Sequence, residues 1–212
     1  MKILIAGCAG QLGRSLIAAL GQHTVEAAPR NRLDITRLST VRQAIAELGP
    51  DLVINAAAYN HVDGAESNAI DAYRSNALGP RNLALVTAAA GIPLLHVSTD
   101  YVFDGAAKRP YHEYDRPRPL STYGLSKLAG EVAVRELNPR HYLLRTAFLF
   151  HPAGGNFLNT MLSLSQRPQV KVIDDQFGSP TCAAFGRRNI WTDTNRSLWC
   201  LSHGGAGRRV TV

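Results

Sequence analysis

Cysteines and long hydrophobic runs are scarce in this chain of 212 residues. Its three cysteines, Cys8, Cys182 and Cys200, are an odd number, and their spacings fit neither a disulfide framework nor a zinc site. No apolar run approaches the ~18 residues that span a bilayer, and residues 1–7 predict a strand entering a glycine turn rather than a signal peptide. We therefore expect a soluble globular protein located in the cytoplasm.

The sequence also lacks the patterns of metal-binding and nucleic-acid-binding proteins. Its seven histidines never fall at metal-ligand spacing. The formal net charge of +7 would suggest a nucleic-acid partner, but the basic residues of the first 182 positions are scattered singly, without interleaved aromatic residues. We expect no nucleic-acid or membrane partner, while an anionic small molecule fits the mild positive excess.

Short apolar runs alternate with longer helical stretches along the chain, which is typical of strand–helix units that form a parallel sheet covered on both faces. The predicted strands are residues 2–6, 24–28, 52–55, 94–98, 141–145 and 170–173. The predicted helices are residues 11–20, 38–48, 69–90, 123–137 and 156–166. The sequence therefore predicts the α/β class, with a Rossmann-like doubly wound parallel sheet.

A glycine-rich turn follows the first predicted strand. Gly7, Gly10 and Gly13 separate this strand from a helix with leucines at helical spacing, which is the context of a dinucleotide-binding fingerprint. Such glycines let the backbone approach a pyrophosphate at the amino terminus of the helix. The first two glycines stand one residue further apart than in the commonest form, so the motif taken alone is only moderately specific. An ordinary strand-to-helix turn is the alternative, which the strand–helix context makes the weaker of the two.

No acidic residue ends the second predicted strand, where NAD-binding units usually hold the ribose hydroxyls. This strand leads instead to Arg30 and Arg32, whose guanidinium groups can pair with a 2′-phosphate and so favour NADP(H) over NAD(H). A solvated loop position is an equally good interpretation of each arginine. Asp34 and Ile35 offer a carboxylate and an apolar group near an adenine ring, and a helix cap before residue 38 explains Asp34 nearly as well.

Two further strands end in residues suited to a binding site. Small side chains follow the strand at residues 52–55, as a cofactor lying across strand ends requires, although tight helix–sheet contacts also favour them. Ser98, Thr99 and Asp100 place two hydroxyls and a carboxylate at the end of the next strand, where hydroxyls can orient a substrate carbonyl.

Tyr123 and Lys127 are the most informative pair in the sequence. Residues four apart lie on one helical face, so the Lys127 ammonium is expected near the Tyr123 hydroxyl, where it would lower a phenol pKa that is ordinarily ~10. This pairing beside a glycine turn suggests proton exchange next to a bound dinucleotide. Glu131 and Glu136 on the same helix are interpreted as its solvated face, and residues 111–117 as an ordered loop that either connects elements or lines a cleft.

In this order, the motifs resemble those of the extended short-chain dehydrogenases/reductases, and within them the dTDP-4-dehydrorhamnose reductase family. The shared segments are Gly7-x-x-Gly10-x-x-Gly13, residues 55–58, 98–105, 119–131, Arg145-Thr146 and residues 175–181. The resemblance implies transfer of hydride from NADPH, or sometimes NADH, to the C4 ketone of dTDP-4-dehydro-6-deoxy-L-mannose, giving dTDP-L-rhamnose. A magnesium requirement and a homodimer stay open.

The resemblance also implies individual roles. Tyr123 would protonate the nascent alkoxide, Lys127 would hold the nicotinamide ribose and lower the phenol pKa, and Thr99 would hydrogen-bond the ketone oxygen. Asp100 and Phe148 would face the sugar, with Phe148 where the family often carries tryptophan. The implied cofactor contacts are Gly10, Gln11 and Leu12 at the pyrophosphate, Asp34 and Ile35 at the adenosine, and Ala57, Ala58 and Tyr59 at the middle of the cofactor.

The resemblance is expected to end after Thr181, where composition changes. Both tryptophans and a loose glycine run follow it without helical or strand periodicity. We predict an NAD(P)-binding domain at residues 1–181 and a divergent tail at residues 182–212, explained by readthrough in another reading frame, with the substrate domain largely missing. An uninterrupted gene that encodes this tail in frame would contradict that explanation.

Two other functions are compatible with the motifs. One is a non-catalytic NADP-binding regulatory subunit, which would resemble the β subunit of methionine adenosyltransferase. The other is a sugar-nucleotide 4,6-dehydratase or epimerase that keeps NAD bound. Dehydratases usually place glutamate after the Thr-Asp pair, whereas Tyr101 stands there in this chain, which makes this second alternative the weaker one.

Overall fold

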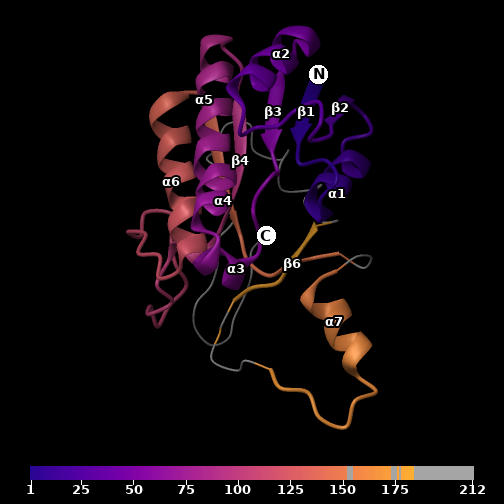
Figure 1. Cartoon of the computed structure of the whole chain (residues 1–212), viewed down its shortest axis with the longest axis vertical. Coiled ribbons are helices and arrows are strands. Elements are labelled where there is room, and N and C mark those ends of the chain that lie inside the picture. The colour runs from indigo at the N-terminus through magenta and orange to yellow at the C-terminus, as the bar shows by residue number, and fades with distance from the viewer. Residues whose placement is uncertain (152–154, 173–175, 177, 184–212) are drawn as a thin grey trace.

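The structure of the protein is a computed structural model that describes residues 1–151, 155–172, 176 and 178–183. The predicted tail at residues 184–212 lies outside the described residues. Five parallel strands form the central sheet in the order β2-β1-β3-β4-β5 (Figure 1). Their bounds are β1 Lys2–Ala6, β2 Thr24–Ala28, β3 Leu52–Asn55, β4 Leu94–Thr99 and β5 His141–Thr146.

The strand order reverses direction at β1. The chain first adds β2 on one side of β1, and then adds β3, β4 and β5 in turn on the other side. In the registers at the carboxyl ends, Ala6 lies opposite both Ala28 and Asn55, and Thr99 lies opposite Thr146. Since ligands of open α/β sheets bind outside the carboxyl ends of the strands at such a switch point, this edge is the expected location of a site.

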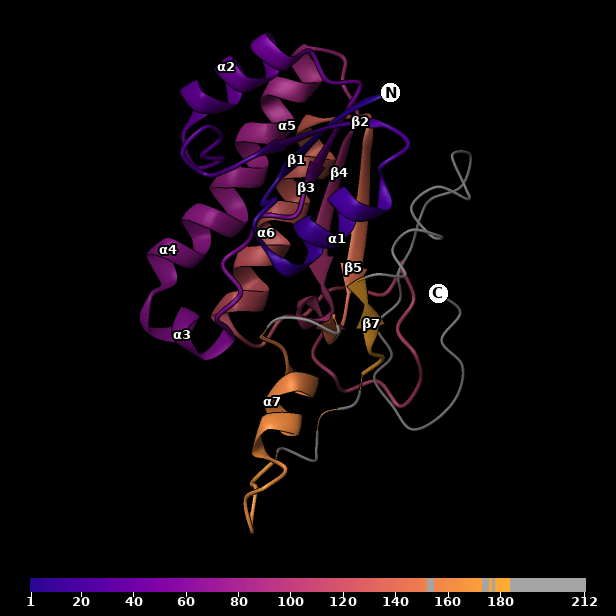
Figure 2. The same cartoon turned by 90° about the vertical axis from the view of Figure 1, so that its right-hand side faces the viewer.

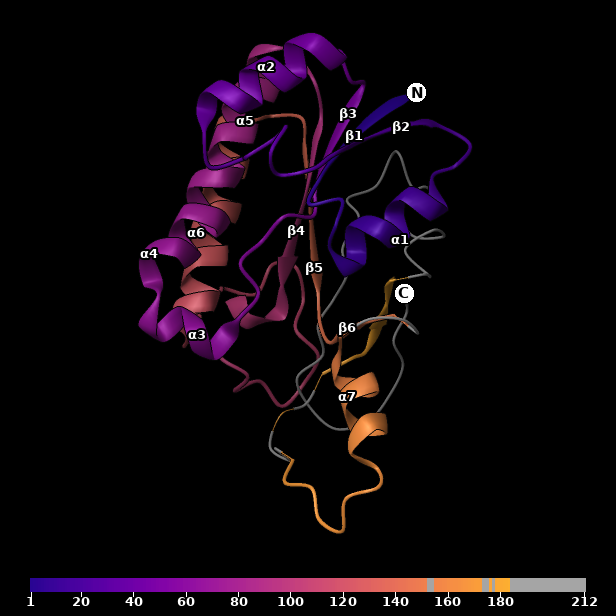
Figure 3. The ribbon, with the colours of Figure 1, turned by 45° about the vertical axis from the view of Figure 1, so that its right-hand side comes forward.

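Helices cover both faces of the sheet. Helix α1 (Gln11–Ala19) lies on one face, and α2 (Leu38–Leu48), α5 (Gly79–Ala89) and α6 (Thr122–Leu137) lie on the other (Figures 2 and 3). The predicted α/β class and the doubly wound parallel sheet are therefore confirmed.

Alternate strand residues build two cores. The core under α2, α5 and α6 contains Leu4, Val53, Leu94 and Leu143, and the core under α1 contains Ile3, Ile5, Ile54 and Leu95. Because both faces are covered, apolar side chains are buried on both sides of each strand, and the strands read as continuous hydrophobic runs.

The long helix predicted at residues 69–90 is divided in the structure. Helix α4 (Ala69–Tyr73) passes through a π-helical segment, Arg74–Leu78, into α5. The wide turn places Asn76 in a fully buried position against α6. A Cβ atom on Gly130 of α6 would collide with the carbonyl oxygen of Asn76, so this glycine permits the close contact of the two helices.

Four short elements were not expected from the sequence. Helix α3 (Val62–Ser67) and a 3₁₀ turn (Asp100–Val102) follow β3 and β4. Beyond β5, the short strands β6 (Leu149–Phe150) and β7 (Thr181–Cys182) pair in parallel. The helix predicted at residues 156–166 forms as α7, Phe157–Leu164. Residues 170–172 form no strand, so the strand predicted there is wrong as far as this part of the chain is described. No helix in the described ranges is both long and apolar enough to cross a membrane.

Gly13→Ala is expected to destabilise the fold by ~1–3 kcal/mol through overpacking. A Cβ atom at this position would collide with the Gly7 carbonyl oxygen and would lie 2.7 Å from the Cα atom of Cys8. Gly21→Ala is the matched control, since its Cβ would meet only the Ala18 carbonyl oxygen, at 3.9 Å, and its effect is expected within ~0.5 kcal/mol. Urea unfolding of both variants measures the difference, and equal stabilities would contradict the steric argument.

Candidate functional site

The glycine turn packs directly against the strand end across the switch point. Gly7 has a φ of 79°, and a Cβ atom on it would lie 2.5 Å from the backbone nitrogen of Ala57. Gly10 is the N-cap of α1 and provides no side-chain cap, so the first amide groups of this helix stay available. These amides and the helix dipole favour an anionic group at this position.

Gln11 and Leu12 face protein rather than solvent. The Nε2 atom of Gln11 donates to the Leu149 carbonyl oxygen at 3.1 Å, and its Oε1 atom accepts from Asn156 at 3.3 Å. Leu12 packs against the core under α1. The predicted pyrophosphate contact of these two residues is therefore available through their backbone amides.

The loop after β2 contains the residues predicted to hold the adenosine. Arg30 is exposed, as an arginine that reads a 2′-phosphate must be. Asp34 accepts from the Thr36 amide and hydroxyl at 3.0 and 2.8 Å. Although partial burial acts to raise it, these hydrogen bonds and the charges of Arg30 and Arg37 hold the pKa of Asp34 below its ordinary value. Asp34 therefore shapes its own turn, and the N-cap of α2 is Arg37.

Ile35 occupies a different place from the one predicted. Its side chain is buried in the core and covers Gly79, where a Cβ atom would lie 2.5 Å from the Ile35 Cδ1 atom. Its carbonyl oxygen accepts from Asn82 at 2.9 Å. The apolar side chain expected beside an adenine ring thus packs against α5 instead.

Asn76 connects the loop after β3 to the helix that carries Tyr123. Its Oδ1 atom accepts from the Tyr59 amide at 2.8 Å, and its Nδ2 atom donates to the Tyr59 carbonyl at 3.0 Å. The same Nδ2 atom donates to the Ser126 hydroxyl at 3.0 Å, which in turn donates to the Tyr123 carbonyl at 2.7 Å. The backbone of Tyr59, at the end of the Ala57–Tyr59 loop, is thereby tied to the helix turn that carries Tyr123. No sequence signal marks Asn76, because its role depends on the π turn.

Thr99, Asp100 and Tyr123 meet at the carboxyl end of β4. The Thr99 hydroxyl donates to Asp100 at 3.0 Å and accepts from the Tyr101 amide at 3.3 Å. The rings of Tyr101 and Tyr123 contact edge to face, with centroids 5.6 Å apart. Burial raises the pKa of Asp100, although the hydrogen bond with Thr99 opposes this. The structure therefore brings together the predicted hydroxyl, carboxylate and phenol.

The expected lowering of the Tyr123 pKa is wrong for the chain alone. Tyr123 is 8% exposed, and this burial raises the pKa of its phenol to about 12, opposed by the Thr99 side chain and reinforced by the charge of Asp100. Lys127 does not offset this, because its Nζ atom donates to the carbonyl oxygen of Val97 at 2.7 Å. Tyr123 therefore holds its proton firmly at neutral pH.

Lys127 is 2% exposed, and burial lowers the pKa of its ammonium group to about 8, while Glu131 acts in the opposite direction.

A buried neutral histidine lies in the same layer between the sheet and α6. His96 Nδ1 pairs with Asn55 Nδ2 at 3.0 Å, and burial together with the charge of Lys127 lowers the pKa of His96 well below its ordinary value. Of these two neighbouring groups, Lys127 carries the positive charge and His96 is neutral.

Glu131 is fully buried, so its assignment to the solvated face of the helix is wrong. It accepts two hydrogen bonds from Arg145, at 2.9 and 2.6 Å, and Arg135 approaches within 3.7 Å. The guanidinium of Arg145 also lies over the ring of Phe103, 4.9 Å from its centroid. Glu136 is exposed, as predicted. Helical spacing alone did not separate these two glutamates, because only the packing of α6 on β5 decides which one is covered.

The loop predicted at residues 111–117 is held by its own contacts. The Tyr111 ring stacks on Phe103 with centroids 4.2 Å apart, and its hydroxyl donates to Asp104 at 2.7 Å. Arg109 and Asp115 form two hydrogen bonds of 2.7 Å each. The loop is therefore ordered, and it continues from the Thr99–Asp100 strand end.

Phe148 lines a groove of about 870 Å³ beyond the end of β5. Its φ of 43° is in the left-handed region, which is unusual for a bulky residue. Its ring covers Gly178, where a Cβ atom would collide with it. The rest of the groove is largely apolar and includes Leu149, Phe150, Phe157, Leu158, Met161, Lys171, Val172, Gln176 and Pro180.

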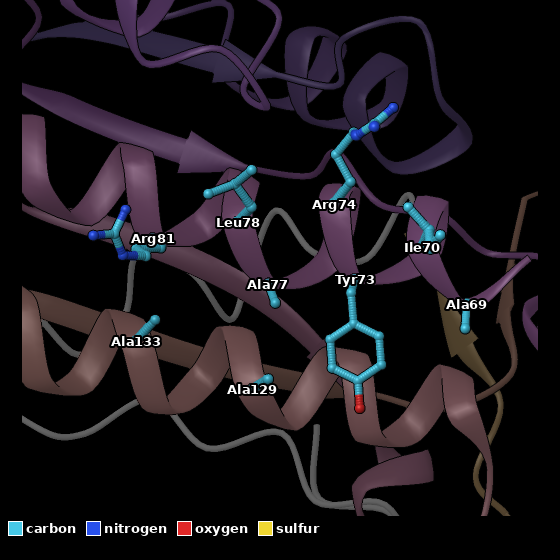
Figure 4. A pocket seen from close by; sticks show the side chains of 9 residues that line it. All are labelled: Ala69, Ile70, Tyr73, Arg74, Ala77, Leu78, Arg81, Ala129 and Ala133. Atoms are coloured by element: carbon cyan, nitrogen blue, oxygen red, sulfur yellow. The ribbon is translucent and has the colours of Figure 1, made fainter.

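A second groove, of about 680 Å³, lies away from this site (Figure 4). It runs between α6 and the α4–α5 segment, and its α6 lining residues Ala129 and Ala133 lie on a different helical face from the buried Lys127. Within the described ranges, no group of three or more His, Cys, Asp or Glu side chains is arranged to hold a metal ion.

The fold and the site define a class of protein, the Rossmann-like domains of the short-chain dehydrogenase/reductase type. The sequence profile of one family within this class, the RmlD substrate binding domain, matches residues 1–192. The chain belongs to this family. The match extends past Thr181, where we expected the resemblance to end.

Proteins named dTDP-4-dehydrorhamnose reductase are among the relatives. Those of Sinorhizobium fredii and Streptomyces griseus are 41% and 44% identical over 185 residues, which cover 86% and 85% of this chain. The chain spans 62% and 61% of these relatives' own lengths, less than two thirds.

Solved structures carry the same name. The enzyme of Bacillus anthracis in complex with NADP superposes with a TM-score of 0.87 at 38% identity, covering 93% of this chain and 72% of that chain. The Clostridium acetobutylicum structure gives 0.85 at 44% identity, covering 90% and 69%. The family resemblance drawn from the sequence is confirmed.

The buried Lys127 ammonium gives a testable pH dependence of stability. Its pKa is about 8 in the folded chain and 10.5 for an unperturbed lysine, so between these pH values the unfolded chain binds more protons. The free energy of unfolding that Lys127 contributes should therefore rise with pH across this window. Urea unfolding of the cofactor-free chain at pH 7.5 to 10, compared with Lys127→Met, measures it. A difference in unfolding free energy between the two proteins that stays constant from pH 7.5 to 10 would contradict the lowered pKa of Lys127.

Removing the Glu131 carboxylate should be strongly destabilising. Glu131→Ala leaves the buried Arg145 guanidinium without its partner, and breaking a buried ion pair in this way costs about 3–5 kcal/mol. Glu136→Ala on the exposed face of the same helix is the control, with an expected change within ~0.5 kcal/mol. Chemical denaturation compares the two, and a similar small loss in both would show that the pair contributes little.

Proposed function

We propose that the chain catalyses NADPH-dependent reduction of the C4 ketone of dTDP-4-dehydro-6-deoxy-L-mannose to give dTDP-L-rhamnose. The observation that carries this proposal is the convergence of Thr99, Tyr123 and Lys127 at the carboxyl edge of the sheet. Asn76 links the helix bearing Tyr123 to the loop that follows Asn55, and the glycine turn packs on the same loop. The names of the relatives supply the substrate.

The residues present fit a dinucleotide. The uncapped amino terminus of α1 suits a pyrophosphate, and Ala57 and Ala58 carry only small methyl side chains at the strand end. The exposed Arg30 suits a 2′-phosphate, which favours NADPH over NADH, and the solved B. anthracis relative is in complex with NADP. When bound, NADPH supplies the hydride.

Tyr123 is suited to act as the acid in this reduction. With a pKa of about 12 it is protonated at neutral pH, and it can give its phenolic proton to the substrate oxygen as negative charge develops there. The Thr99 hydroxyl orients this oxygen through a hydrogen bond. Lys127, with a pKa of about 8, is predominantly charged at neutral pH and is the residue proposed to hold the nicotinamide ribose of the bound cofactor. Asp100 and Phe148 are the residues proposed to contact the sugar.

The relatives favour the reductase over the non-catalytic regulatory subunit, since three of them, each more than 40% identical to this chain, are named as reductases. A homodimer, a magnesium requirement and a cytoplasmic location stay predictions. The domain boundary at residue 181 also stays a prediction, since the described residues end just beyond it.

Tyr123→Phe tests the proposed function. The phenylalanine keeps the ring contact with Tyr101 but removes the acidic proton, so the rate of NADPH consumption with the keto-sugar should fall by about 10²–10⁴-fold. Absorbance at the reduced nicotinamide band measures turnover, and fluorescence titration should show unchanged NADPH affinity. Equal rates for both proteins would remove Tyr123 from the mechanism. Tight NADPH binding without turnover of the keto-sugar by the unsubstituted chain would favour the regulatory subunit.

A further inference from the structure

The carboxylate of Glu66 binds the first residue of the helix that carries Tyr123. Its two oxygens accept from the Thr122 amide at 2.8 Å and from the Thr122 hydroxyl at 2.7 Å. Glu66 stands near the end of α3, 56 positions earlier in the chain. A carboxylate at a helix amino terminus satisfies an unpaired amide and interacts favourably with the helix dipole. This pair of contacts therefore fastens α3 to the start of α6.

The first turn of α6 has a local cap as well, and each of the two caps accepts from a different backbone amide. The Ser121 hydroxyl accepts from the Gly124 amide at 3.1 Å, which leaves the Thr122 amide to Glu66. Ser121 alone can start the helix, because its side chain is the ordinary N-cap group. The contact from Glu66 adds a connection between distant segments that the helix does not need in order to form.

Apolar packing places α3 against Tyr123. Ala65, which precedes Glu66, is fully buried in one cluster with Ala72 and Tyr123, and Tyr59, Val62 and Tyr101 pack against this cluster. Gly64 of α3 also fits closely under Tyr59, since a Cβ atom on it would lie 3.0 Å from the Tyr59 hydroxyl. Helix α3 thus joins the loop at residues 57–59 to the ring of Tyr123.

We propose that Glu66 is a positioning residue for Tyr123. Its carboxylate fixes the first turn of α6 relative to the loop at residues 57–59, and so sets where the phenol lies relative to the cofactor site. Glu66 acts through Thr122 and touches no reacting atom. This inference rests on the proposed function for its catalytic consequence, while the connection between α3 and α6 stands on the hydrogen bonds themselves.

The effect of Glu66 has a defined direction with pH. Hydrogen bonds from Thr122 lower the pKa of Glu66 below its ordinary value, so the carboxylate is ionised throughout the neutral range. What it contributes to the folded state is present above its unfolded pKa and is lost as the pH falls through its folded pKa. Assays at neutral pH therefore measure the protein with Glu66 ionised and hydrogen-bonded to Thr122.

Steady-state kinetics with NADPH and the keto-sugar test the proposal in four variants. Glu66→Ala should lower kcat by about 10–100-fold, because small displacements of a catalytic group cost up to about two orders of magnitude, with less than about threefold change in KM for NADPH. Glu66→Gln should recover much of kcat, since its amide oxygen still accepts one hydrogen bond. Thr122→Val keeps the backbone amide of residue 122 but lacks the side-chain hydroxyl. In the Glu66→Ala protein, adding Thr122→Val should cause no further loss of kcat. Asp71→Ala, which removes only a surface ion pair at 3.5 Å, is the control and should match the unsubstituted chain.

Amide hydrogen exchange separates this inference from the proposed function. In Glu66→Ala the amides of residues 122–126 should exchange faster, while those of β1 and β3 and the whole Asp71→Ala protein should not change. If the unsubstituted chain shows no turnover, the proposed function fails. The hydrogen-exchange result then decides by itself whether Glu66 holds α3 to the start of α6. Unchanged kcat with unchanged exchange in Glu66→Ala would overturn the proposal. So would a loss of kcat that Glu66→Gln does not recover, or a loss accompanied by faster exchange throughout the sheet, since either indicates general destabilisation.

Discussion

The burial of one ammonium group organises the site. A buried charge is costly unless it is paired and hydrogen-bonded, and Lys127 meets this constraint by donating to the Val97 carbonyl, with Glu131 one turn further along α6. The contact fixes α6 against β4. Because Thr99 follows Val97 by two residues and Tyr123 precedes Lys127 by four, the same contact also sets the hydroxyl and the phenol at one edge of the sheet.

Polar residues of the layer between α6 and the sheet support this arrangement. Glu131 is satisfied by Arg145, and His96 stays neutral beside Asn55, so neither of these two groups adds a net charge beside Lys127. Buried ion pairs contribute little net stability compared with apolar packing. Their presence here fits a domain in which some stability is given up to hold ionisable groups in fixed positions. The raised pKa of Tyr123 has the same origin, since the burial that packs the ring also keeps its proton in place.

Most regular elements were predictable, because apolar runs and helical spacing are local signals. The strands β1, β2 and β3 and the helix α2 have the predicted bounds. The failures share a cause in long-range packing. The π turn around Asn76 forms against Gly130 of α6, and α3 is too short to show periodicity before it docks on Tyr123. Ile35 was predicted from the sequence to contact the adenosine. In the fold it covers Gly79 instead, in a helix that begins more than forty residues later.

The sequence by itself determined the α/β class, the glycine turn and the spacing of Tyr123 and Lys127, because each depends on residues close together in the chain. Tertiary structure alone decided the protonation of these groups and their connections. The pKa values of Tyr123 and Lys127 follow from burial, which neighbours far along the chain provide. Likewise, the carboxylate of Glu66 reaches the start of α6 only once two segments 56 positions apart are folded together. Local pattern selects the groups, and long-range packing sets their electrostatic environment.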